Sequence, residues 1–126
     1  MNDKIKILIV DDEPFIRESL TGFLEDCDFT VAAAVSAEQA MEMLALSAFH
    51  VAIVDLRLPG MNGDVFIKEI HKLNPDIRFL IHTGSVDYRL SIELLNIGVK
   101  PEHVFYKPQH DLDLFVEKIN ELIDVS

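Results

Sequence analysis

The chain has 126 residues, of which 49% are hydrophobic and 26% charged, a balance typical of a folded globular protein rather than a disordered one. Its length fits one domain with a proper core, so we expect residues 1–126 to form a single domain. The formal net charge of −11 argues against direct binding of nucleic acid, whose phosphates need a basic surface, and suits a bound cation or a partner with a basic patch.

Neither export nor membrane insertion is expected. Asp11 interrupts the N-terminal apolar run too early for a signal peptide, and no apolar run approaches the length that spans a bilayer. Cys27 is the only cysteine, which excludes an internal disulfide and metal sites that need two cysteines. We therefore expect a protein of the reducing cytoplasm that does not contact a membrane.

Five short apolar runs predict β-strands. They alternate with segments of helical period, which is the pattern of a parallel sheet built from βα units. Right-handed crossovers then place helices on both faces of that sheet. The expected strands are Lys4–Val10, Phe29–Val35, Phe49–Val54, Ile77–Ile81 and His103–Tyr106.

The segments that follow the strands carry apolar residues at helical spacing. Pro14 suits the first turn of the first helix, Ser36 caps the second, and the third begins after Asn62. Ser85 can cap a fourth helix that runs to Gly98, a plausible left-handed residue just past its end. That fourth helix is apolar on more than one side, which indicates a second buried face, toward a partner.

The predicted fold is α/β: a flavodoxin-like (βα)5 doubly wound parallel sheet with strand order 2-1-3-4-5. Ligands bind such sheets at the carboxyl ends of the strands, near the switch point between strands one and three. Polar residues follow four of the five predicted strands at this edge. In chain order they are Asp11 and Asp12, Asp55, Thr83, and Lys107.

Three carboxylates at one sheet edge would repel each other strongly. Two unit charges ~4 Å apart interact by roughly 4 kcal/mol at an effective dielectric of ~20. Protonation or a cation must relieve this repulsion, and oxygen ligands with room for water suit Mg²⁺ better than zinc. The Lys107 ammonium and the Thr83 hydroxyl can contact phosphoryl oxygens. The set therefore predicts a site at which Asp55 accepts a phosphoryl group with the help of Mg²⁺.

From about Lys4 to Asp124 the chain resembles the receiver domain of two-component response regulators. The matching pieces, in order, are Ile9-Val10-Asp11-Asp12, Val54-Asp55-Leu56-Arg57-Leu58-Pro59-Gly60-Met61-Asn62-Gly63, Thr83-Gly84 and Lys107-Pro108. The resemblance implies a phosphorylation-switched signalling domain that catalyses its own phosphorylation and dephosphorylation and is not an enzyme with an external substrate. Asp55 would take its phosphoryl group from a phosphohistidine of a histidine kinase or a histidine phosphotransfer protein.

The resemblance also implies how a magnesium ion would be held. Asp12 and Asp55 would bind Mg²⁺ directly, together with the backbone carbonyl of Arg57. Asp11 would hold a water molecule bound to the metal. These assignments come from the family's motif and not from the spacing of the residues.

The family's switch and one departure from it bear on the output. Thr83 would move onto the phosphoryl group, Lys107 would pair with it, and the bond from Lys107 to Pro108 would be cis. A downstream effector domain or protein would then read the face made by helix four, strand five and helix five. In the family an aromatic residue usually stands three positions before the lysine and moves with the threonine, whereas this chain has Val104, so a switch through backbone shifts alone stays open. The segment 97–103 also differs from the common family pattern.

Three other functions compete with a phosphorylation switch. A phosphatase of the haloacid dehalogenase type needs a second acid two residues after its aspartyl nucleophile, where this chain has Arg57. A flavin-binding protein needs a phosphate-binding loop after the first strand, where Asp11, Asp12 and Glu13 would repel the phosphate. A degenerate receiver that acts as a constitutive protein-interaction module is the main alternative, and Val104 keeps it open.

Simpler interpretations apply to several other residues. Glu13 is interpreted as an acid that favours a helix N-terminus, and Cys27 as a small apolar residue in the interior. The five histidines lack metal-ligand spacing and are interpreted as surface or hydrogen-bonded groups. The chain ends at Ser126 with no effector domain, so it either acts alone or is a fragment of a longer regulator or hybrid kinase.

Overall fold

The computed structural model describes residues 4–58 and 61–124, so the expected turn at Pro59–Gly60 lies outside the described residues. Five parallel strands form the main sheet in the order β2-β1-β3-β6-β7. This is the expected flavodoxin-like order 2-1-3-4-5. The strands are β1 (Lys6–Val10), β2 (Thr30–Ala34), β3 (Val51–Val54), β6 (Arg78–Thr83) and β7 (Val104–Tyr106).

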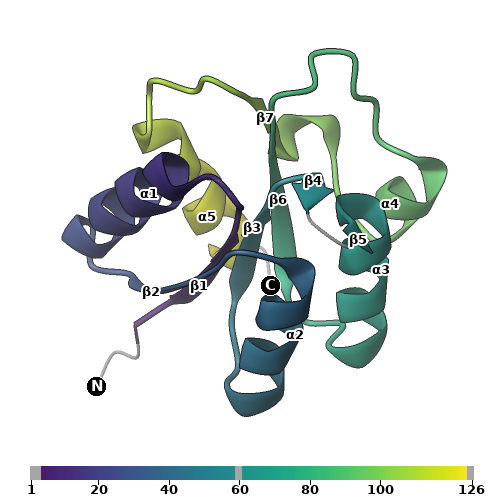
Figure 1. Cartoon of the computed structure of the whole chain (residues 1–126), viewed down its shortest axis with the longest axis horizontal. Coiled ribbons are helices and arrows are strands. Elements are labelled where there is room, and N and C mark those ends of the chain that lie inside the picture. Colours follow the sequence, from purple (N-terminus) through teal and green to yellow (C-terminus); the bar gives the residue numbers. More distant parts are fainter. Residues whose placement is uncertain (1–3, 59–60, 125–126) are drawn as a thin grey trace.

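Helices cover both faces of this sheet (Figure 1). On one face lie α1 (Pro14–Asp26) and α5 (Asp113–Asp124), and on the other α2 (Ala37–Leu46), α3 (Gly63–Leu73) and α4 (Ile92–Asn96). Successive residues of β1 alternate between the two cores, with Ile7 and Ile9 on the α1/α5 side and Leu8 and Val10 on the other. Burial on both faces explains why the central strands β1, β3 and β6 appear in the sequence as continuous apolar runs. None of the described helices is long and apolar enough to cross a bilayer.

A small two-stranded sheet that the sequence did not predict follows β3. It pairs β4 (Arg57–Leu58) with β5 (Met61–Asn62) in antiparallel fashion. The next residue, Gly63, begins α3 and donates its N–H to the carbonyl of Leu56 (3.0 Å). A Cβ on Gly63 would lie 2.6 Å from Leu56 Cα, so only glycine fits this close approach of two backbone segments.

The fourth helix is much shorter than predicted. It spans only Ile92–Asn96, with Ser91 as its N-cap, whereas residues 84–91 form a loop of bends and turns. The prediction that Ser85 caps a helix was wrong, because the Ser85 N–H donates to Thr83 Oγ1 and the loop is held by tertiary contacts instead of helical ones. Gly98 has the expected positive φ, 102°, just after this helix.

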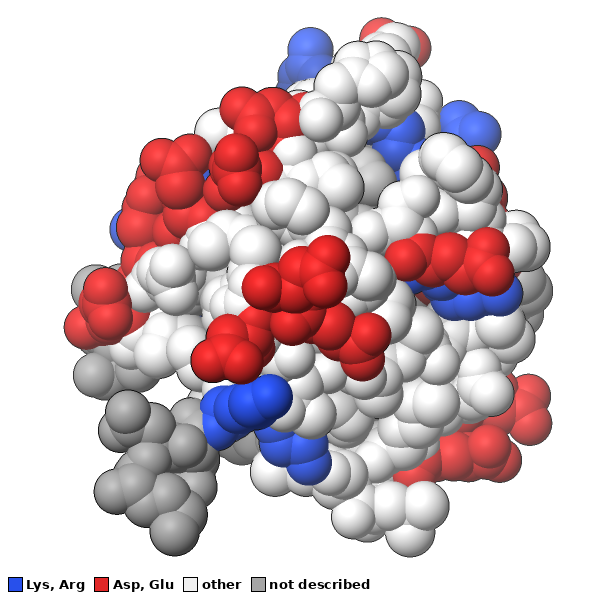
Figure 2. Space-filling model, turned by 90° about the vertical axis from the view of Figure 1, so that its left-hand side faces the viewer, with Lys and Arg blue, Asp and Glu red and all other residues white. Residues whose placement is uncertain are grey.

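The side of the molecule that carries α1 is strongly acidic, as Figure 2 shows. Glu18, Glu25 and Asp26 of α1 are exposed. Cys27 is also exposed, so the prediction that it packs in the interior was wrong. It is the C-cap of α1 and precedes Asp28, whose φ of 77° turns the chain toward β2.

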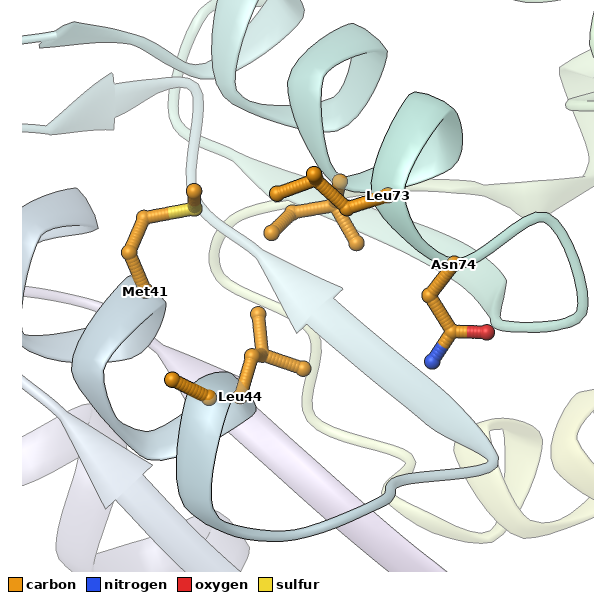
Figure 3. A pocket seen from close by; sticks show the side chains of 6 residues that line it. Met41, Leu44, Leu73 and Asn74 are labelled. Atoms are coloured by element: carbon orange, nitrogen blue, oxygen red, sulfur yellow. The ribbon is translucent and has the colours of Figure 1, made fainter.

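A mainly apolar hollow lies between the last turns of α2 and α3 (Figure 3). Its volume is about 440 Å³, and its lining residues are Met41, Leu44, Ala45, Ile70, Leu73 and Asn74. These helix ends precede β3 and β6, so the hollow lies at the edge where the strands begin. It is therefore separate from the polar residues at the carboxyl ends of the strands.

Candidate functional site

Sheet order brings the predicted polar residues together at the carboxyl ends of the strands. Val10 of β1 is in register with Val54 of β3, so Asp11 and Asp55 follow at neighbouring positions. Lys107 follows β7 and reaches across β6 toward them. Its Nζ lies 2.9 Å from Asp11 Oδ2 and 3.2 Å from Asp55 Oδ2.

This ion-pair network is largely withdrawn from solvent. The side chain of Lys107 is 11% exposed, that of Asp11 3% and that of Asp55 5%. Lys107 Nζ also lies 2.5 Å from Glu13 Oε2, whose side chain is 55% exposed. One ammonium group therefore offsets two buried carboxylates and one surface carboxylate.

Four acidic side chains gather closely enough to bind a cation. Asp11, Asp12, Glu13 and Asp55 each offer one carboxylate oxygen, and these oxygens all lie within 4.8 Å of one another. Asp11 and Asp55 are buried, whereas Asp12 and Glu13 are exposed. An all-oxygen set of this kind that is open to water on one side suits a hard divalent cation such as Mg²⁺.

Backbone hydrogen bonds orient the two buried carboxylates. Asp11 Oδ1 accepts the N–H of Glu13 (2.9 Å), and Asp55 Oδ1 accepts the N–H of Arg57 (3.1 Å). In both residues the other oxygen, Oδ2, faces Lys107. These backbone hydrogen bonds thus fix Oδ1 of each carboxylate and direct Oδ2 toward Lys107 Nζ.

The surroundings shift the pKa values of Lys107, Asp11 and Glu13, and not all in the same direction. Burial lowers the pKa of Lys107, but hydrogen bonds to Glu13 and Asp11 outweigh it, so the pKa is raised and the ammonium keeps its charge. Burial raises the pKa of Asp11 despite its bond to Lys107. The hydrogen bond from Lys107 lowers the pKa of Glu13. Burying Asp11 in this acidic cluster therefore has an electrostatic cost that Lys107 offsets only in part.

Thr83 lies at the same edge but is engaged with its own loop. It is fully buried, and its Oγ1 accepts the N–H of Ser85 (3.0 Å). Its backbone carbonyl accepts the N–H of Lys107 (2.7 Å). Within the described part of the chain no hydrogen bond joins Thr83 to Asp55. The peptide bond from Lys107 to Pro108 is cis, as predicted.

Glu13 takes part in the ion-pair network of the site, contrary to expectation. Glu13 is the N-cap residue of α1, but its side chain makes no capping hydrogen bond and pairs with Lys107 instead. The interpretation of Glu13 as only a helix-terminal acid was therefore wrong. The sequence feature that could have indicated this pairing is a third acid directly after Asp11-Asp12 at the edge of the sheet. Of Arg57, the structure brings the backbone N–H to Asp55, while the side chain is exposed.

His82 contradicts the interpretation of every histidine as a surface or hydrogen-bonded group. It is 3% exposed, and neither ring nitrogen has a hydrogen-bond partner among the described residues. Its ring contacts Phe115 of α5 edge to face, with ring centroids 5.1 Å apart. Burial lowers the pKa of His82 to about 4, so the ring is neutral at pH 7.

The model of one protein family, described as the response regulator receiver domain, matches residues 7–119. The match includes every residue of the site described above. The chain belongs to this family. A receiver domain is not an enzyme beyond its own phosphorylation chemistry, and receiver domains partner with histidine kinases. The acidic cluster and Lys107 of this receiver domain are consistent with switching by phosphoaspartate.

Curated relatives of this receiver domain are transcriptional regulatory proteins. One is the uncharacterized regulator YesN of Bacillus subtilis, which is 27% identical over 121 residues. Another is ZraR of Escherichia coli K12, which is 35% identical over 97 residues. The matches cover 94% and 77% of this chain but only 32% and 22% of those proteins. The chain thus spans about a third or less of the length of these relatives.

Solved structures of receiver domains share the fold. A CheY-like receiver domain protein from Methanospirillum hungatei is 29% identical, with a TM-score of 0.80 over 98% of this chain and 100% of that one. The response regulator TrrA of Thermotoga maritima, solved in complex with Mg²⁺ and BeF, is 26% identical. Its TM-score is 0.80 over 94% of this chain and 98% of that one. The predicted family and fold are therefore both confirmed.

Proposed function

We propose that Asp55 of this receiver domain accepts a phosphoryl group from a phosphohistidine of a histidine kinase or a histidine phosphotransfer protein. The observation that carries the proposal is the position of Lys107 Nζ, 2.9 Å from Asp11 and 3.2 Å from Asp55. A buried ammonium that contacts one oxygen of Asp55 is well placed to pair with a phosphoryl group attached there. Residues 1–126 would form the single receiver domain that carries this site, working in the cytoplasm.

In the proposed transfer, a carboxylate oxygen of Asp55 forms a bond to phosphorus while the bond from phosphorus to the donor's imidazole nitrogen breaks. The imidazole leaves as the neutral histidine after it takes up a proton. Lys107 offsets charge on the phosphoryl oxygens, and the Thr83 hydroxyl donates to one of them once the loop that follows Thr83 has shifted. In the later hydrolysis, water attacks phosphorus, the bond from phosphorus to the Asp55 oxygen breaks, and inorganic phosphate leaves, so Asp55 returns to its free carboxylate.

Asp12 and Asp55, with the backbone carbonyl of Arg57, would hold Mg²⁺ directly, and Asp11 would hold a water bound to it. The clustering of four carboxylate oxygens within 4.8 Å supports this assignment. When bound, the ion supplies positive charge that offsets the phosphoryl oxygens and orients them. The complex of TrrA with Mg²⁺ and BeF concerns a relative of the same fold and makes the same ion the first to test.

Asp12→Ala should weaken Mg²⁺ binding and phosphorylation together. The Asp12 side chain is exposed and makes no hydrogen bond to the described residues 4–58 and 61–124, so the fold should be unaffected. We expect an affinity for Mg²⁺ at least tenfold lower by isothermal titration calorimetry, the loss typical when one carboxylate ligand of a hard cation is removed. If Asp12→Ala binds Mg²⁺ and gains phosphate as the wild type does, the metal is held elsewhere.

The direct test of the phosphoacceptor uses acetyl phosphate with Mg²⁺ and intact-protein mass spectrometry. We expect a mass gain of one phosphoryl group, which Asp55→Asn abolishes because an amide is a poor nucleophile. Asp76→Asn is the matched control, since Asp76 is an exposed acid on the turn before β6, and it should be phosphorylated normally. No mass gain in the wild type would support the alternative that the chain is a constitutive interaction module, which Val104 in place of an aromatic keeps open.

Phosphorylation would alter the face formed by α4, β7 and α5, and a downstream effector domain or protein would bind there. Exposed apolar side chains on this face support the proposal: Ile92 and Leu95 of α4 and Tyr106 of β7. Val104, in the position usually taken by an aromatic, is half-buried. The acidic surface of the chain makes nucleic acid an unsuitable direct ligand and favours protein partners with basic patches.

A further inference from the structure

The loop of residues 84–91 is fastened to two neighbouring elements through one tyrosine. Tyr88 donates its hydroxyl to Asp64 Oδ1 in the first turn of α3 (3.1 Å). The backbone carbonyl of Tyr88 accepts the hydroxyl of Tyr106 at the end of β7 (3.2 Å) and Arg89 Nη1 (3.0 Å). Tyr88 therefore joins α3, β7 and the loop between β6 and α4.

The environment of Tyr88 keeps this hydrogen bond in place. Its ring is half-buried and packs against the core on the α2/α3/α4 side. Burial raises the pKa of the Tyr88 hydroxyl, and the neighbouring Asp64 carboxylate raises it further. The hydroxyl therefore keeps its proton and remains a donor to Asp64 throughout the physiological range of pH.

The same loop begins directly at Thr83. The Thr83 hydroxyl oxygen accepts the N–H of Ser85, and the Tyr88 N–H donates to the carbonyl of Ser85 (3.2 Å). One hydrogen bond to the Thr83 side chain and one between backbone groups thus connect Thr83 to Tyr88 across a short stretch of chain. A movement of Thr83 toward Asp55 would pull on the segment that Tyr88 fastens to Asp64.

We propose that Tyr88 is a positioning residue of the switch. Its hydrogen bond to Asp64 stabilises the loop arrangement described here, and this bond is lost when Thr83 engages a phosphoryl group on Asp55. Tyr88 thereby sets how readily the domain passes from one loop arrangement to the other. This chain has Val104 at the position where the family usually has an aromatic residue. Here the contact between Tyr88 and Asp64 restrains the loop of residues 84–91 instead. This inference rests on the proposed function.

Tyr88→Phe tests the inference because it removes the hydroxyl and keeps the ring. We expect the variant to bind beryllofluoride, a phosphoryl mimic, in the presence of Mg²⁺ roughly tenfold more tightly than the wild type, because a hydrogen bond to a charged acceptor that exists only in the free state is removed. Isothermal titration calorimetry measures the affinity. In the free protein, amides of residues 84–91 should exchange with solvent faster, which reports loosening of the loop without any phosphoryl chemistry.

Two further variants separate the hydrogen bond from general effects. Asp64→Ala removes the acceptor, so in the Tyr88→Phe background it should cause no additional tightening. Lys68→Gln is the matched control, because it removes the exposed ion pair from Lys68 of α3 to Glu93 of α4 (3.1 Å). That pair also links α3 to the region after the loop, yet its removal should change beryllofluoride affinity by less than about twofold.

The outcomes distinguish this inference from the proposed function. If the wild type binds no beryllofluoride and gains no mass from acetyl phosphate, the proposed function fails. If the wild type binds and Tyr88→Phe binds equally or more weakly, or loop exchange does not change, the role assigned to Tyr88 is wrong. Additive effects of Tyr88→Phe and Asp64→Ala would also contradict it.

Discussion

Lys107→Met should lower the free energy of unfolding of the magnesium-free domain by about 3–5 kcal/mol, the effect of removing one partner from a buried ion pair. The change leaves Asp11 and Asp55 buried side by side without a counter-charge. Methionine keeps most of the apolar stem of lysine, so lost charge and not lost packing is measured. For a domain of this size the melting temperature should fall by roughly 10 °C or more.

The loss in free energy of unfolding caused by Lys107→Met should depend on both Mg²⁺ and pH. Added Mg²⁺ should restore part of it, because a cation among the carboxylates replaces the missing charge. Burial already raises the pKa of Asp11, and loss of the ammonium raises it further. The folded state of the variant then binds a proton more tightly than the unfolded state, so the loss of stability is full above the folded pKa of Asp11 and shrinks as the pH falls through it.

Lys118→Met is the matched control for this experiment. Lys118 also pairs with two acids, Glu102 (3.4 Å) and Glu121 (3.2 Å), but both acids are about half exposed. Surface pairs of this kind add little to stability, so the control should unfold close to the wild type. Equal melting of Lys107→Met and Lys118→Met at pH 7 without metal would show that the buried charges do not need the lysine.

His82 should make the domain lose stability as the pH falls from 6.5 to about 4. The pKa of His82 is lowered from 6.5 to about 4 in the folded state, so between these values the unfolded chain takes up a proton that the folded chain does not. Stability is full above pH 6.5 and is lost progressively as the pH falls toward 4. The shift corresponds to about 3 kcal/mol, and denaturant titrations at several pH values would measure it.

His82→Leu should remove most of this acid sensitivity. Leucine is of similar size, and it replaces two ring nitrogens that have no hydrogen-bond partner among the described residues, so stability at pH 7 should equal or exceed that of the wild type. His110→Leu, at an exposed position, should keep the wild-type dependence on pH. An unchanged slope between pH 6.5 and 4 in His82→Leu would assign the acid sensitivity to other groups.

Most of the sheet could be predicted because its central strands are buried on both faces. Val51, Ala52, Ile53 and Val54 are all fully or almost fully buried, and such a run leaves no polar face that could be mistaken for a helix or a loop. The alternation of strands with helical segments then restricts the topology. The main error was the fourth helix, because residues 84–91 owe their conformation to Tyr88 contacts with Asp64 and Tyr106, which are distant in sequence.

The candidate site was predictable for a similar reason. Residues that follow parallel strands meet at one edge, so Asp11, Asp55 and Lys107 could be grouped before any distance was known. The pairing of Glu13 with Lys107 could not, because Glu13 belongs to a helix start, where an acid has a sufficient local explanation. The isolation of the His82 ring could not be predicted either, since it depends on which groups of α5 surround it.

The tight packing of Gly63 against Leu56 has a mechanical consequence. Because there is no room between these two backbones for even a methyl group, the residue after Asp55 and the first residue of α3 cannot slide past each other. The backbone beside Asp55 is therefore expected to be rigid where it contacts the start of α3. We thus expect a change at the Asp55 carboxylate to displace the segment that leads from β6 into α4 more than the start of α3.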